Sequence, residues 1–67
     1  MSYAKLRGRI REVFGTDEAF SKAMGLNKAT ISKKLNNKTD WSREEIEKAC
    51  NLLNVAVSDM HTYFFTA

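Results

Sequence analysis

This chain has few of the residues that build reactive or cross-linked proteins: its 67 residues include one cysteine, one histidine, three glycines and no proline. Cys50 has no second cysteine to pair with, and one cysteine with one histidine is too few ligands for a structural zinc site. The sequence also lacks a nucleophile–base pair, a metal-ligand cluster and a glycine-rich phosphate loop. We therefore expect a domain that is held by packing alone, is not an enzyme, and uses no metal, cofactor or small-molecule substrate.

Long apolar runs are absent as well. No segment approaches the roughly 20 apolar residues that a membrane helix needs, and the N-terminus leads into amphipathic helix without a signal-like apolar block. The hydrophobic and charged fractions, 43% and 28%, are those of an ordinary soluble globular protein. We expect one small domain over residues 1–67, in the cytoplasm and without a membrane partner.

Acidic residues are missing from one part of the chain. Residues 22–38 contain five lysines and no aspartate or glutamate, although the net charge of the whole chain is only +3. Glu44, Glu45, Glu47 and Asp59 collect towards the C-terminus. This distribution predicts a positive side and a negative side.

Apolar spacing predicts an all-α fold. A first helix is expected over about residues 3–14 and is ended by Gly15, and Thr16 or Asp17 can cap a second helix. The residues expected to face inward on these two helices are Tyr3, Leu6, Ile10, Val13, Phe14, Phe20, Ala23 and Met24.

The third helix is expected from residue 28 to about residue 35 or 36, with Asn27 as its N-cap. Only Ile31 and Leu35 look buried on it, so most of this helix should be exposed. Asn37 suits the left-handed conformation that closes a helix.

Ser42 and Glu45 form a capping box that opens a fourth helix, and Asn54 ends it. Ser58 is expected to cap a short fifth segment over about residues 59–63. The inward residues of the fourth helix are Ile46, Ala49, Cys50 and Leu53. The sequence thus predicts five helices.

The second and third helices have the spacing of a helix-turn-helix over about residues 17–36. Gly25 lies at the turn, the small residue Ser21 precedes it by four positions, and the β-branched Ile31 follows it by six. We expect a positive φ at Gly25, and we expect any side chain there to crowd the helix crossing. Such a unit holds its second helix in the DNA major groove.

Two motifs give this pattern a family resemblance. Residues 30–38 read T-I-S-K-K-L-N-N-K after the turn, and residues 44–49 read E-E-I-E-K-A. With the order of helices, they make nearly the whole chain resemble the phage Cro and repressor family, especially small Cro-type regulators. Ser21 stands where the family usually has alanine, and Asn37 where glycine is common.

The resemblance implies a compact, five-helix lambda-repressor-like domain that binds operator DNA and has no catalytic activity. It also implies that the first turns of the third helix face base edges. The matching residues are Asn27, Lys28, Ala29, Ser32 and Lys33. Lysine can donate to guanine, serine can donate or accept, and the alanine methyl can pack on thymine. The alternative is an ordinary solvated helix face.

A second set of polar residues lies where phosphates could be held, which would orient the protein without reading sequence. These candidates are Thr16, Thr30, Lys34, Asn36, Lys38 and Thr39. Thr16 stands at a helix start, where backbone N–H groups can hold a phosphate, whereas the neighbouring Asp17 would oppose one and is better explained as a cap. For the lysines the alternative is simple solubility.

Three further residues have structural interpretations. Trp41 precedes the capping box, where an apolar residue staples a helix start, so we expect it at the core edge rather than as a base-stacking platform. Cys50 should be a buried thiol. His61 should lie at the surface or in an interface.

The three consecutive aromatics near the C-terminus predict a dimer surface. Tyr63, Phe64 and Phe65 point in different directions on any regular backbone, so at least one should be exposed in a monomer, and an exposed aromatic patch usually marks a partner surface. The alternative is that all three close the small core.

Together these features predict a transcriptional regulator that binds a pseudo-palindromic operator in double-stranded DNA as a homodimer. If it is encoded by a phage or prophage, it acts in the bacterial cytoplasm or nucleoid. The rival hypothesis is a protein-interaction module, an antirepressor or inhibitor that keeps the helix-turn-helix shape but binds another regulator.

Overall fold

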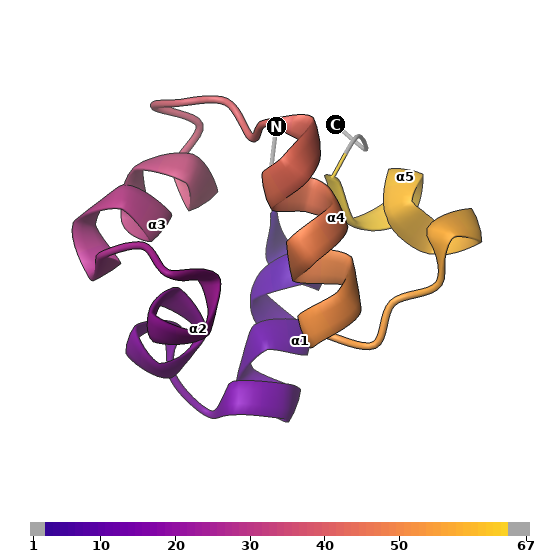
Figure 1. Cartoon of the computed structure of the whole chain (residues 1–67), viewed down its shortest axis with the longest axis horizontal. Coiled ribbons are helices and arrows are strands. Elements are labelled where there is room, and N and C mark those ends of the chain that lie inside the picture. The colour runs from indigo at the N-terminus through magenta and orange to yellow at the C-terminus, as the bar shows by residue number, and fades with distance from the viewer. Residues whose placement is uncertain (1–2, 65–67) are drawn as a thin grey trace.

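The structure, a computed structural model, describes residues 3–64, apart from the side chain of Val57, and over these residues it contains helices and no strand. The elements are α1 (Ala4–Phe14), α2 (Asp17–Met24), α3 (Lys28–Leu35), α4 (Arg43–Leu52), a short 3₁₀ helix η1 (Val57–Asp59) and α5 (Met60–Phe64). Figure 1 shows α2 and α3 on one side of the molecule and α5 on the opposite side. The prediction of a compact domain with five α-helices is confirmed.

Three predicted N-caps are confirmed. Thr16 Oγ1 accepts a hydrogen bond of 3.1 Å from the Ala19 amide, and Asn27 Oδ1 accepts one of 2.8 Å from the Thr30 amide. The capping box of α4 is reciprocal, because the Glu45 amide donates to Ser42 Oγ at 3.1 Å and the Ser42 amide donates to Glu45 Oε1 at 2.8 Å. These bonds satisfy amide groups that a helix start leaves without partners.

Residues with positive φ end four of the helices. Gly15 (φ 82°) follows α1, Gly25 (φ 76°) follows α2, Asn37 (φ 61°) follows α3 and Asn54 (φ 55°) follows α4. Glycine and asparagine enter this region at lower cost than other residues. The helix ends are therefore set by the residues that the sequence analysis singled out.

The core gathers one apolar stripe from each helix. Its buried members are Tyr3, Leu6, Ile10, Phe20, Met24, Ile31, Leu35, Ile46, Ala49, Cys50, Leu53 and Phe64. Burial raises the pKa of the Cys50 thiol, which keeps it protonated at neutral pH. The buried structural thiol that we predicted is confirmed.

Val13 departs from the predicted stripe, since it is 42% exposed. Leu6, Ile10 and Phe14 form a row at spacings of four, and the ring of Phe14 lies 5.5 Å from that of Phe20. Val13, three residues after Ile10, falls beside this row and faces solvent. The inward position predicted for Val13 is wrong.

The C-terminal segment begins earlier than predicted. Ser58 lies inside the 3₁₀ helix η1 rather than capping a helix, and the Asp59 amide donates to the Ala56 carbonyl at 2.9 Å. α5 then runs on to Phe64. In the part of the chain that the structure describes, no helix has the length and apolar character needed to cross a membrane.

Candidate nucleic-acid interface

The start of α3 carries an exposed polar surface, which we call the candidate DNA face. It consists of Asn27, Lys28, Ala29, Ser32 and Lys33, all of which are exposed. Lys28 and Ser32 are one helical turn apart, as are Ala29 and Lys33, so the four lie in two adjacent rows. The structure therefore brings the predicted base-contacting residues onto one surface.

The charges of this face are uncompensated. No carboxylate of residues 3–64 forms a salt bridge with Lys28 or Lys33. Asn27 uses its side-chain oxygen for two bonds, from the amide of Thr30 and from Thr30 Oγ1 at 3.0 Å. That leaves the amide NH₂ of Asn27 as the group it can offer a ligand. The candidate DNA face thus presents mainly donors and positive charge.

Lys34 does not belong to this surface. Its side chain is only 9% exposed, and its Nζ lies 2.9 Å from Glu45 Oε1. The same Nζ donates to the Asp40 carbonyl at 2.8 Å and lies 5.8 Å from the centre of the Trp41 ring. Because its ammonium is buried and paired, the prediction that Lys34 contacts phosphate is wrong.

Arg7 of α1 is a functional candidate that the sequence analysis missed. Its Nη2 donates to the Leu35 carbonyl at 3.1 Å and to Asn36 Oδ1 at 2.9 Å, which caps the C-terminal end of α3 with a positive charge. Asn36 Nδ2 also donates to Ser32 Oγ at 3.3 Å. Asn36 was predicted to hold phosphate, but its side chain is engaged within the protein at both ends.

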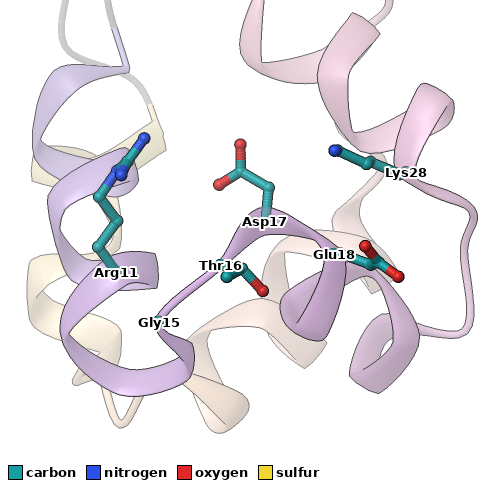
Figure 2. A pocket seen from close by; sticks show the side chains of 6 residues that line it. All are labelled: Arg11, Gly15, Thr16, Asp17, Glu18 and Lys28. Atoms are coloured by element: carbon teal, nitrogen blue, oxygen red, sulfur yellow. The ribbon is translucent and has the colours of Figure 1, made fainter.

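An open hollow lies where the C-terminal end of α1 meets the starts of α2 and α3. Figure 2 shows Arg11 on one side of it, Lys28 on the other, and the carboxylate of Asp17 pointing into the space between them. Arg11 was not predicted as a candidate, although it lies four residues before the glycine that ends α1. The hollow combines two cations with the acidic residues Asp17 and Glu18, so an entering phosphate would meet both attraction and repulsion.

The other predicted phosphate contacts differ in availability. Lys38 and Thr39 are exposed in the loop between α3 and α4. Thr16 is exposed, but its hydroxyl is the cap of α2. Thr30 is half-buried and bonded to Asn27. Lys38 and Thr39 are therefore the most accessible of this set.

The aromatic residues near the C-terminus divide. Phe64 is 3% exposed, and its ring meets that of Trp41 edge to face at 5.2 Å, so the prediction that Phe64 lies in a dimer interface is wrong. Tyr63 is half-buried, with Lys5 Nζ 5.5 Å from its ring centre. Phe65 lies outside the described residues. Trp41 also packs against Tyr3, with ring centres 6.4 Å apart, which confirms its predicted place at the core edge.

The sequence can now be compared with known proteins. Residues 1–67 match the family described as "Protein of unknown function (DUF739)". The chain belongs to this family. A solved structure similar to it is the solution structure of the modulator of repression (MOR) of the temperate bacteriophage TP901-1 from Lactococcus lactis, with 43% identity and a TM-score of 0.86.

That match covers 97% of this chain and 88% of the phage protein, so the DUF739 chain shares the whole phage domain rather than a fragment of it. No curated protein matches the chain. The predicted similarity to a small phage regulatory protein is confirmed at that level. Its narrower assignment to the Cro type stays a prediction.

Proposed function

We propose that this DUF739 chain is a sequence-specific, DNA-binding transcriptional regulator of the Cro and repressor type. It occupies a pseudo-palindromic operator with α3 in the major groove, in the bacterial cytoplasm or nucleoid. The observation that carries this proposal is the candidate DNA face: exposed donors and uncompensated lysines on the first turns of α3, directly after the Gly25 turn.

Base recognition is assigned to the residues that leave α3 on that face. Lys28 and Lys33 can donate to guanine O6 and N7, while Ser32 can donate or accept. The methyl group of Ala29 suits a thymine methyl. No aspartate or glutamate lies between Glu18 and Asp40, so no carboxylate of α3 would repel the groove.

Phosphate contacts are assigned to exposed cations and hydroxyls beside this face. Lys38 and Thr39 follow α3 in the loop, and Arg11 and Thr16 lie at the hollow. Lys34 is excluded by its pairing with Glu45. These contacts would supply affinity and orientation, whereas the α3 side chains would supply discrimination.

The proposed unit on DNA is a homodimer. The longest extent of the described chain is 26 Å, whereas successive major grooves are about 34 Å apart, so one copy reads one half-site. α5 lies on the side of the molecule opposite α3, where a partner would leave the candidate DNA face clear (Figure 1). We assign the dimer surface to Tyr63 and Phe65 without Phe64.

A second function is favoured by two observations. The similar phage protein is titled a modulator of repression, and Asp17 places a carboxylate at the edge of the surface where phosphate would pass. Both suit a module that binds another regulator. In that case the candidate DNA face contacts protein.

A fluorescence-anisotropy titration separates the two functions. The probe is labelled duplex DNA flanking the chain's own gene, titrated with and without random competitor DNA. We expect binding that survives competitor and is lost in the double variant Lys28→Met and Lys33→Met. The matched control is Lys5→Met, which removes a charge beside Tyr63 on α5. Equal binding by the parent and the double variant, or none by the parent, would favour the protein partner.

A further inference from the structure

We propose that Lys34 and Glu45 are positioning residues, whose ion pair sets the orientation of α3 and thereby the discrimination between operator and random DNA. This inference rests on the proposed DNA-binding function. It assigns a role to two charged residues that face the protein interior rather than the candidate DNA face.

The pair brings α3, the following loop and α4 together at one oxygen atom. Glu45 Oε1 receives Lys34 Nζ at 2.9 Å and the Ser42 amide at 2.8 Å. Lys34 Nζ makes a further bond to the Asp40 carbonyl. The residue that completes the capping box of α4 therefore also holds the inner face of α3.

α3 needs such a tie because its apolar contacts are few. It has eight residues, of which only Ile31 and Leu35 are buried apolar side chains. Two apolar side chains in one row oppose lifting of the helix, but they leave rotation about its axis weakly determined. Hydrogen-bonded charges have preferred distances and directions, so they restrain that rotation.

The tie acts together with a second one from another helix. Arg7 of α1 holds the Leu35 carbonyl, while Glu45 of α4 holds Lys34. The two contacts join the C-terminal half of α3 to different neighbours. Loss of one should therefore turn or loosen α3 without detaching it.

A role in orientation explains this arrangement better than stability or phosphate binding. A buried ion pair brings little net stability compared with apolar side chains of similar volume. Its charge is also neutralised within the protein, so Lys34 adds little to attraction for DNA. What the pair supplies is a defined position for α3, and hence for Ser32 and Lys33 one residue either side of that row.

The test compares Lys34→Met with Lys33→Met, two neighbouring substitutions that remove the same charge. The measurements are the ratio of Kd for random duplex to Kd for the flanking duplex, and the slope of log K against log salt. We expect Lys34→Met to lower the ratio at least tenfold with the slope unchanged. Lys33→Met should lower both the ratio and the magnitude of the slope. An unchanged ratio in Lys34→Met, or a slope reduced by about 0.9, would overturn the proposal.

Conservative and disruptive changes at Glu45 supply a second, independent pair. Glu45→Gln keeps an oxygen that can accept from Lys34 and Ser42, so it should retain most of the ratio. Glu45→Ala should lose it. Equal ratios for these two variants would overturn the role of the tie. All variants are compared at a temperature where circular dichroism shows full folding.

Amide hydrogen exchange without DNA separates failure of the tie from failure of the function. In Lys34→Met, amides of the last turn of α3 should exchange at least tenfold faster than in the parent, while those in the middle of α1 stay unchanged. Unchanged exchange in α3 would overturn the tie. Faster exchange in a chain that binds no DNA would confirm the tie and reject the proposed function.

Discussion

At the scale of single residues, the candidate DNA face makes separable claims. Ser32 and Lys33 are exposed one turn beyond Lys28 and Ala29, so each should contact a base edge rather than only the backbone of DNA. Ser32→Ala or Lys33→Ala should weaken binding to the operator by about 1–3 kcal/mol and binding to random DNA by much less. Competition titrations measure both values, and equal losses on the two DNAs would place the residue among the phosphate contacts.

Glu45 makes stability depend on pH. Burial opposes its ionisation, but hydrogen bonds from the Ser42 amide and from Lys34, together with the Lys34 charge, outweigh this and lower its pKa from the ordinary 4.5. A lowered pKa in the folded state stabilises the fold fully above the unfolded value, and this contribution is lost as pH falls through the folded value.

We therefore expect the urea midpoint of the parent to fall as pH drops below about 4.5. Part of this fall should be absent in Glu45→Gln, which does not titrate. Urea unfolding from pH 3 to pH 7 checks this. Parallel curves for the parent and Glu45→Gln would show that the carboxylate gains nothing from its partners.

At the scale of the helix and the turn, Gly25 is needed for its backbone conformation and not for space. Its φ is 76°, and a Cβ built there would meet only Lys48 Nζ at 3.8 Å, an ordinary contact. The expected crowding of the helix crossing is therefore wrong, whereas the expected positive φ is confirmed.

Gly25→Val should lose about 1–2 kcal/mol of stability from backbone strain, and more if the β-branch narrows the allowed rotamers. Gly25→Asn should lose less, because asparagine occupies this region in the same molecule at positions 37 and 54. Thermal unfolding gives the comparison. Equal losses in the two variants would show that strain at positive φ is not the cause.

The helices were predictable because their signals are local. Thr16, Asn27 and Ser42 cap helices through bonds to residues three positions away, so the sequence alone identifies them. Lys34 could have been found by the same reasoning, since positions 31, 34 and 35 share one helix face. Its lysine side chain suggested exposure, because the carboxylate that neutralises it comes from another helix.

Long-range contacts were beyond prediction from the sequence. Arg7 caps α3 from 28 positions away, and no local pattern marks that pairing. Phe64 was expected at a surface because three consecutive aromatics cannot all face one way. The choice of which one is buried depends on Trp41, which meets both Tyr3 and Phe64 where the two ends of the described chain come together.

At the scale of the whole molecule, the division among the C-terminal aromatics predicts two different phenotypes. Phe64→Asp would place a charge in the core, so it should unfold or severely destabilise the domain. Tyr63→Asp with Phe65→Asp should leave the helix signal in circular dichroism intact but abolish cooperative binding to a full operator. Sedimentation on operator DNA gives the stoichiometry, and two copies of the double variant bound as tightly as the parent would exclude this dimer surface.

The salt dependence of DNA binding tests the central claim most directly. In a dimer, Lys28, Lys33 and Lys38 of both copies carry exposed charges, and each neutralised phosphate contributes about 0.9 to the slope of log K against log salt. We predict a slope of about −3 to −5 on the DNA flanking the gene, measured by anisotropy from 50 to 300 mM salt. A slope near zero, with no preference over random DNA, would contradict the account and favour the protein-partner function.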